Sequence, residues 1–369
     1  MATRMRGRRM RLRIEPRVAP SRALAVAAPL LAVLAAMLLG ALLFTAMGLN
    51  GLKIIREIFF TPVLEPSRWP DLGVKAAPLI IIAVGLSLGF RANVWNIGAE
   101  GQYIVGAVFG TGVALATADM TGWWILPLMI AAGILGGMAW AVIPALLRTR
   151  LLVSEILTSL MLTYVAIQIL NYLVRGPWRD PEGHNFPQTR LFTDDQTLPI
   201  VVPGTIVHLG IPLALLIAAA AWVLLQRTVA GFEIRTVGLA PAAARYAGFK
   251  ADRTIWKCLL GGGALAGLAG ILEAAGPFGQ LTPQFPVNYG FTAIIVAFLG
   301  RLHPLAIVLA GLVMAVTYVG GEIAQTTLAL PHPAIGIVQA LMLFSLLALD
   351  MLVRYRLRFV PAPRVETQA

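Results

Sequence analysis

The stretch FRANVWNIGAEGQ, residues 90–102, is a polar break between two apolar runs, 76–88 before it and 103–118 after it. The residues with charged or amide side chains in this break are Arg91, Asn93, Asn96, Glu100 and Gln102. Two apolar runs separated in this way predict a discontinuous membrane helix. Non-helical backbone is tolerated at membrane depth only where protein covers it or a water-filled path runs beside it. The alternative is an ordinary cytoplasmic loop between two spans.

Ionisable groups in a membrane segment are costly, so the break is a candidate functional site. If residues 93–100 are helical, Asn93, Asn96 and Glu100 fall on one face. Glu100 would then lie in the first turn of the following helix, where the helix dipole favours a negative charge. The candidates for lining a substrate path, two of which carry aromatic rings, are Phe90, Asn93, Trp95, Asn96, Glu100 and Gln102. The alternative role for these residues is helix-end capping and packing.

The composition indicates a membrane protein. Hydrophobic residues make up 58% of the chain and charged residues only 12%, whereas about a quarter of a soluble domain is charged. Apolar runs of about 20 residues recur along the chain. The fold class predicted is therefore an all-α polytopic membrane protein with about ten transmembrane helices and a broken helix near 90–102. The predicted spans are 23–44, 76–90, 98–117, one that begins at Trp123 and Trp124 and ends near Leu147, 152–174, 211–225, 256–275, 289–299, 305–318 and 335–353.

The placement of the basic residues predicts the orientation in the membrane. The formal net charge is +12, and eight arginines lie in the first 22 residues, directly before the first apolar run. Segments assigned to the inside carry 20 Lys and Arg, against 7 in the two external loops. Basic residues favour the cytoplasmic side, so both termini are predicted to be cytoplasmic. The basic arm is expected to contact anionic lipid but not nucleic acid, because it lacks interleaved aromatic residues.

These patterns also predict the organisation of the chain. The long segment 175–204 is rich in Pro, Gly and Asp and is expected to be ordered by turns. A short helix lying on the membrane is expected at 54–60, where isoleucine and phenylalanine gather. The predicted parts are a cytoplasmic arm 1–22, a transmembrane domain 23–353 with external loops 45–75 and 175–204, a cytoplasmic segment 226–255, and a cytoplasmic tail 354–369.

The second informative stretch is GFEIRTVGLAPAAARYAGF, residues 231–249, which is too polar to span a membrane. Glycines at 238 and 248 flank a short helix predicted from Pro241 to Tyr246, because proline suits the first turn of a helix. A short amphipathic helix held between two spans is a docking surface for a soluble partner, or else rests on lipid headgroups. The candidate docking residues are Phe232, Arg235, Gly238, Arg245, Tyr246 and Phe249.

Several kinds of chemistry have no signature in the sequence. Cys258 is the single cysteine, so no intramolecular disulfide forms. The four histidines are far apart, and no metal or cofactor site is expected. No GxxxxGK[ST] loop occurs, so the phosphate-binding loop of an ATPase is missing. The acids in or beside the spans, each interpreted as a helix cap, are Glu100, Glu155, Glu273, Glu322 and Asp350. They form no ion-coupling cluster of the kind a secondary transporter needs, nor the cluster of an intramembrane enzyme.

Arg91 and Arg301 each follow a short span, which is compatible with two related halves of the kind seen in transporters.

Four stretches together resemble one family. FRANVWNIGAEGQYIVGA (90–107) resembles the signature of permease subunits of ribose-, galactose- and nucleoside-type ABC importers. SEILTSLMLTYVAIQILNYLVRGPWRDP (154–181) is similar to the nucleoside branch, which is associated with basic-membrane-lipoprotein-type binding proteins. The segment 231–249 resembles the cytoplasmic coupling segment of the family, and YGFTAIIVAFLGRLHPLAIVLAGLVMA (289–315) resembles its C-terminal half.

The resemblance implies a function and a set of partners. The chain would be an importer permease of the bacterial inner (plasma) membrane that translocates nucleosides or simple sugars. For a nucleoside, Phe90 and Trp95 would be stacking surfaces for the base. ATP would be used by separate ATP-binding cassette ATPase subunits, which fits the missing phosphate-binding loop. The resemblance further implies a second permease in a heterodimer and an external substrate-binding lipoprotein, and it assigns no catalytic residue to this chain. The alternative is an ion-coupled secondary transporter of a small polar solute.

Overall fold

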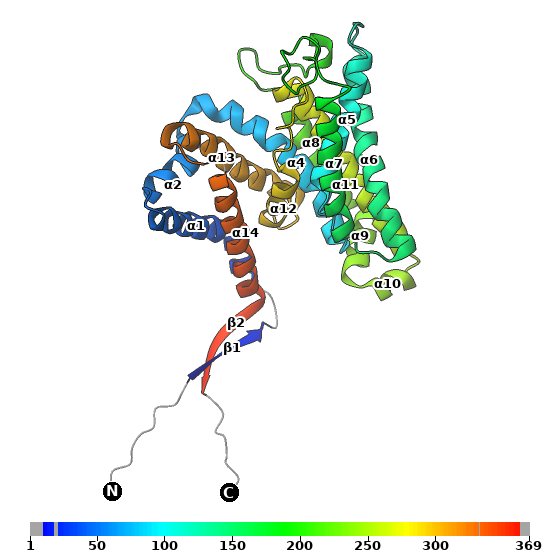
Figure 1. Cartoon of the computed structure of the whole chain (residues 1–369). Coiled ribbons are helices and arrows are strands. Elements are labelled where there is room, and N and C mark those ends of the chain that lie inside the picture. Colours follow the sequence, from blue (N-terminus) through cyan, green and yellow to red (C-terminus); the bar gives the residue numbers. More distant parts are fainter. Residues whose placement is uncertain (1–9, 18–20, 332, 362–369) are drawn as a thin grey trace, which may run out of the picture. The chain divides into compact units, whose positions relative to one another are not determined.

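The computed structural model describes residues 10–17, 21–331 and 333–361 and divides the chain into two compact units (Figure 1). The terminal unit consists of residues 1–51 and 336–369, and the main unit of residues 52–335. Most of the predicted arm 1–22 lies outside the described residues, and so does His332.

The terminal unit contains the two ends of the chain. Its elements are β1 (Met10–Pro16), α1 (Arg22–Ala46), most of α14 (Pro333–Arg354) and β2 (Tyr355–Pro361). β1 and β2 form a two-stranded antiparallel ribbon in which Met10 lies opposite Pro361 and Pro16 opposite Tyr355. An all-α expectation does not include this ribbon. The alternation of arginine with leucine, isoleucine and phenylalanine in both strands favours extended backbone, but these stretches are too short to register as spans.

The main unit is helical throughout its long segments. Its elements are α2 (Gly51–Phe59), α3 (Thr61–Leu64), η1 (Pro66–Arg68), α4 (Trp69–Arg91), α5 (Ala99–Ala116), α6 (Ile125–Leu151), α7 (Glu155–Arg175), η2 (Asp194–Gln196), α8 (Gly210–Arg227), α9 (Val229–Leu239), α10 (Pro241–Tyr246), α11 (Ala251–Glu273), the π-helix η3 (Ala274–Phe278), α12 (Tyr289–Leu299), α13 (Pro304–Leu328) and the start of α14.

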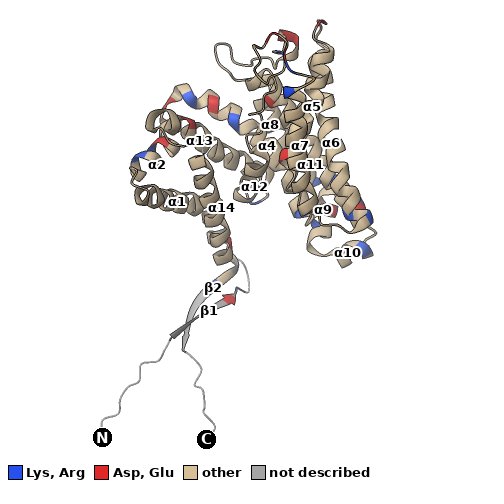
Figure 2. Cartoon of the chain, in the orientation of Figure 1, with Lys and Arg blue, Asp and Glu red and all other residues tan. Residues whose placement is uncertain are grey.

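The polytopic all-α fold is confirmed, because each of the ten predicted spans corresponds to a helix. Among the described residues, eight helical segments are long and apolar enough to cross a membrane. α5 has a polar first turn and α12 has only 11 residues, so neither is among the eight. α4 begins at Trp69 rather than at residue 76, because its first turns accommodate Asp71 and Lys75 at the helix end. Figure 2 shows long uncharged stretches of helix in the main unit, with charges gathered near helix ends and loops.

Glycine contacts between α5, α6 and α11 form the centre of the main unit. A Cβ atom built on Gly106 of α5 would collide with Gly267 of α11, and one built on Gly137 of α6 would collide with Gly263 and Gly267. Small residues at such positions let helix backbones approach closely. Several glycines of α11 are therefore explained by contact with α5 and α6.

The short helix expected on the membrane surface is present as α2, but protein covers its apolar face. Ile54, Ile58 and Phe59 are buried. A Cβ atom built on Gly320 of α13 would collide with the carbonyl of Ile58, so the two backbones are in contact. The amphipathic pattern indicates a buried face correctly, but it does not distinguish a lipid surface from a neighbouring helix.

Packing against α5 makes one glycine of α11 irreplaceable. A Cβ atom on Gly270 would collide with the carbonyl oxygen of Tyr103, whereas one on Gly261 of the same helix meets no atom within 4 Å. Gly270→Ala is expected to lower the melting temperature of the detergent-purified chain, because overpacking costs about 1–3 kcal/mol. Gly261→Ala should leave it unchanged or raise it, since alanine is the better helix former by about 1 kcal/mol. Equal effects of the two substitutions would contradict this packing.

Candidate functional site

The break between α4 and α5 is a buried loop rather than a continuation of either helix. Residues 92–98 are non-helical, and Asn93 has a φ of 57°. The helical face proposed for Asn93, Asn96 and Glu100 is therefore not formed. The Trp95 backbone N–H donates to Oε1 of Glu155 at 3.1 Å, and the Ile97 N–H donates to Oγ of Ser159 at 3.2 Å. Side chains of α7 thus satisfy backbone groups that no helix satisfies.

Two buried amides close the start of α5. Nδ2 of Asn96 donates to Oε1 of Gln102 at 2.8 Å, and Oδ1 of Asn96 accepts from the Gly98 N–H at 3.1 Å. Both side chains are buried. The first N–H groups of a helix have no partner inside the helix, so polar side chains here stabilise its start. In this conformation the two amides bond to each other and to the backbone.

Glu100 caps a different helix from its own. Its Oε1 accepts from the Asn288 N–H at 3.0 Å and its Oε2 from the Gly290 N–H at 2.6 Å. These donors lie at the start of α12, where the dipole favours a carboxylate. A Cβ atom on Gly290 would collide with the backbone of Glu100, so glycine is required for this approach. The side chain is fully buried.

The aromatic rings of the break form a stack. The ring centroids of Phe90 and Trp95 lie 5.0 Å apart, and Phe90 stacks on Phe298 of α12 at 5.3 Å. Trp95 Nε1 donates to Oδ1 of Asn93, whose side chain is exposed. Aromatic pairs at these separations stabilise the fold beyond their buried area. Phe298 is a partner that sequence reasoning did not identify; contact with a substrate base stays a prediction.

A second break lies next to the first. The residues between α12 and α13 include Arg301 and Leu302, with φ values of 51° and 58°. Nε of Arg91 donates to the carbonyl of Leu302 at 3.0 Å. Burial lowers the pKa of the neighbouring His303, and the Arg91 guanidinium lowers it further. The two segments that sequence analysis compared as possible repeats are therefore in contact with each other.

Three polar side chains are buried together where α5, α11 and α12 meet. We call Tyr103, Glu273 and Tyr289 the outer polar cluster. The Tyr103 hydroxyl and Oε1 of Glu273 have no hydrogen-bond partner among the described residues, and the Tyr289 hydroxyl approaches the Glu273 carboxyl without forming a well-aligned hydrogen bond. Sequence reasoning interpreted Glu273 as a helix cap and did not select the tyrosines. The available signal was Glu273 itself, an acidic residue at the end of a glycine-rich apolar span. Burying an ionisable group in such a span is energetically costly, so its presence indicates a functional site.

An ion pair and a hydroxyl pair lie around the outer polar cluster. Nζ of Lys75 is 3.2 Å from Oε1 of Glu322, and both groups interact electrostatically with Glu273. The hydroxyls of Thr292 and Tyr318 are 2.9 Å apart, and the Tyr318 hydroxyl also donates to the carbonyl of Val287. Lys75 lies near the first residues of α4, an end that the arginine pattern predicts to be extracellular.

The segment 231–249 presents an exposed helix. The predicted helix from Pro241 to Tyr246 is confirmed as α10. Tyr246 is 94% exposed and Leu239 is 86% exposed, and Arg245 is exposed beside them. Aromatic and arginine side chains of this kind are typical anchors of protein interfaces.

The remaining candidates in this segment lie nearer to the body of the main unit. Phe232 meets Phe249 edge-on with ring centroids 6.0 Å apart. Nε of Arg235 donates to the carbonyl of Gly231 at 3.3 Å. Gly238 lies inside α9 rather than between helices, and a Cβ atom there would collide with the carbonyl of Arg91. Gly238 is thus required for contact with the end of α4.

A polar contact attaches α9 to α11. Glu233 accepts from Oγ1 of Thr254 at 2.7 Å and from Nζ of Lys257 at 2.9 Å. Burial raises the pKa of the Glu233 carboxyl, but these two hydrogen bonds outweigh it and hold the pKa below its ordinary value. The carboxylate therefore stays ionised and paired at neutral pH.

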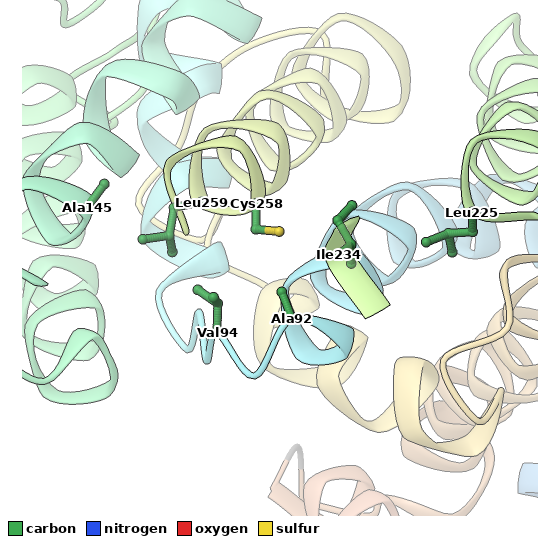
Figure 3. Close-up of a cluster of buried hydrophobic side chains, with 7 residues drawn as sticks. All are labelled: Ala92, Val94, Ala145, Leu225, Ile234, Cys258 and Leu259. Atoms are coloured by element: carbon green, nitrogen blue, oxygen red, sulfur yellow. The ribbon is translucent and has the colours of Figure 1, made fainter. Parts of the chain in front are cut away.

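An apolar cluster joins the same segment to the break. Figure 3 shows side chains from the break, α6, α8, α9 and α11 in this cluster: Ala92, Val94, Ala145, Leu225, Ile234, Cys258 and Leu259. All are buried. The two stretches that the sequence singled out separately, 90–102 and 231–249, therefore share one packed core.

The chain belongs to the family described as "Branched-chain amino acid transport system / permease component", which matches residues 71–347. It is a permease subunit of an ABC transporter of the importer type, a multi-pass protein of the plasma membrane. Among the described residues, no group of three or more His, Cys, Asp or Glu could hold a metal ion.

Relatives cover almost the whole chain. The glucose ABC transporter permease protein TsgB13 of Haloferax volcanii is 38% identical, over 94% of this chain and 93% of the relative. The guanosine permease NupP of Bacillus subtilis is 29% identical over 90% and 94%, respectively. The nucleoside permease NupB of Lactococcus lactis is 27% identical over 86% and 90%. No solved structure matches the chain.

The capping contact of Glu100 makes a stability prediction. Glu100→Gln replaces one acceptor oxygen by an NH₂ group, which cannot accept from the N–H of Asn288 or Gly290. Hydrogen bonds to a charged group contribute about 1.5–3 kcal/mol, so the melting temperature of the purified chain should fall. Glu182→Gln, in an exposed loop, is the matched control and should leave it unchanged. A Glu100→Gln chain as stable as this control would rule out the capping role.

Proposed function

We propose that this permease carries nucleosides or simple sugars into the cell. Support comes from the names of the relatives, which specify glucose, guanosine and nucleosides. These solutes share a ring with several hydroxyl groups. The family description names branched-chain amino acids. The names of TsgB13, NupB and NupP instead specify glucose, nucleosides and guanosine, all of which contain a hydroxylated ring.

The partners in this proposal follow from the cytoplasmic segment. ATP-binding cassette ATPase subunits dock on α9 and α10, and ATP binds to them and not to this chain. The observation that carries this docking is the exposure of Tyr246 on α10 and of Leu239 at the end of α9, the helix that Glu233 attaches to α11. A second permease, in a heterodimer, and an external substrate-binding lipoprotein complete the proposed importer.

The contacts also support a mechanism. ATP-driven movement of the partner displaces α10 and, with it, α9. The bonds of Glu233 to Thr254 and Lys257 transmit this displacement to the start of α11. The apolar cluster transmits it to the break as well. Substrate passes beside residues 90–102 when these segments move, with Asn93, on the exposed side of the break, as a contact.

Docking on α10 makes a prediction about assembly. The double substitution Arg245→Glu with Tyr246→Ala reverses a charge and removes an exposed ring. Loss of a central aromatic or arginine anchor commonly costs 2 kcal/mol or more. The ATPase subunits should therefore no longer copurify in mild detergent, and ATP-dependent uptake into vesicles should be lost.

The control for this test is Tyr172→Ala with Arg175→Glu. These residues are an exposed tyrosine and an exposed arginine in the last turns of α7, outside the segment 231–249. This control variant should retain the ATPase. If the α10 variant retains both the ATPase and uptake, α10 is not the docking surface. Gradient-driven uptake by the chain alone, without ATP, would instead establish a secondary transporter.

A further inference from the structure

The outer polar cluster leaves three buried polar atoms without partners. More than nine in ten buried polar groups in proteins form a hydrogen bond, and leaving one unpaired costs about 1–3 kcal/mol. The hydroxyls of Tyr103 and Tyr289 and Oε1 of Glu273 all lack a well-formed hydrogen bond among the described residues, and the Tyr289 hydroxyl only approaches the Glu273 carboxyl. Three such atoms on three different helices indicate that their partner is a molecule outside the chain.

The three side chains converge because of close helix contacts. Gly270 lies against the backbone of Tyr103, and Glu273 follows one turn later on the same face of α11. The ring centroids of Tyr103 and Tyr289 are 6.1 Å apart in an edge-on arrangement. Glu273 interacts electrostatically with both tyrosines. All three polar groups therefore face one small region of the interior.

Aromatic rings hold these groups rigidly. Tyr103 stacks on Phe285 with centroids 5.0 Å apart and an interplanar angle of 12°. Tyr289 meets Tyr318 edge-on at 5.2 Å, and the Glu100 carboxylate fixes the start of α12 beside it. A carboxylate and hydroxyls beside aromatic rings are complementary to a ring that has hydroxyl groups and an apolar face. The carboxylate and hydroxyls form hydrogen bonds with the ring hydroxyls, and the aromatic rings pack against the apolar face.

We propose that Tyr103, Glu273 and Tyr289 bind the hydroxylated ring of the transported solute, the ribose of a nucleoside or a free sugar. Glu273 accepts hydrogen bonds from ring hydroxyls, and the tyrosine hydroxyls bond to the remaining ring oxygens. This site rests on the proposed function and names the part of the solute that is recognised.

The charges around the site select an uncharged solute. Glu273 carries its own negative charge when ionised, and the ammonium of Lys75 is paired with Glu322 at 3.2 Å. A phosphorylated sugar or nucleotide would bring a further negative charge next to a buried carboxylate, which is strongly unfavourable. The site therefore accepts the nucleoside or sugar and rejects its phosphate ester.

The test uses the full chain, assembled in proteoliposomes with its ATPase, second permease and substrate-binding lipoprotein, and measures uptake of tritiated guanosine and tritiated glucose. Tyr103→Phe and Tyr289→Phe should each raise the half-saturating concentration of the transported probe about three- to tenfold, and Glu273→Gln about tenfold or more. Tyr164→Phe, an exposed tyrosine of α7, is the matched control and should transport as the wild type does.

Removing an unpartnered hydroxyl leaves the packing of a tyrosine intact, so the two phenylalanine variants test the site even if Glu273→Gln fails to assemble. Unchanged half-saturation in both, together with a raised melting temperature, would show that the hydroxyls are packing defects and would overturn this site alone. A wild-type complex that transports neither probe would overturn the proposed solute class as well. Competition by guanosine monophosphate as strong as that by guanosine would overturn the selection against phosphate.

Discussion

The main unit depends on the hydrogen bonds that side chains supply to non-helical backbone inside an apolar protein. Glu155 and Ser159 bond to the loop after α4, and Glu100 bonds to the start of α12. Without these acceptors, buried N–H groups would have neither water nor helix partners. Glu155 also forms an ion pair with Arg148, so a single carboxylate joins the C-terminal end of α6, the start of α7 and the loop.

The long helices and the helix from Pro241 to Tyr246 were predictable, because apolar length and a proline at the first turn are local signals. The polar break was also predictable from its composition. Its hydrogen bonds were not, since Glu100 bonds to residues 188 and 190 positions away. The cover of α2 by α13 and the convergence of Tyr103 with Glu273 depend on which helices are neighbours, and a single sequence does not contain that information.

The amide and carboxylate residues of the break show that a buried polar side chain can stabilise the fold as well as bind a ligand. Asn96, Glu100 and Gln102 were selected because polar groups in an apolar segment are expensive. In this conformation each is engaged with backbone or with another amide. Among the buried polar groups without partners, those of Tyr103, Glu273 and Tyr289 lie instead near the far end of α11. The presence or absence of hydrogen-bond partners within the chain, rather than polarity alone, distinguishes polar residues that stabilise the fold from polar residues that we propose to bind a ligand.

The glycine contacts of α11 limit how the protein changes shape. Where Gly267 meets Gly106 and Gly137, no side chain lies between the backbones, so no change of rotamer could absorb a tilt of one helix against another. The three helices must therefore turn as one block. Bending is left to the two ends of α11, namely the extended residue Lys250 before it and the π-helix η3 after it, where the turns widen. Alternating access in this molecule would therefore require bending at two places, the start of α11 at Lys250 and the π-helix η3 that follows it.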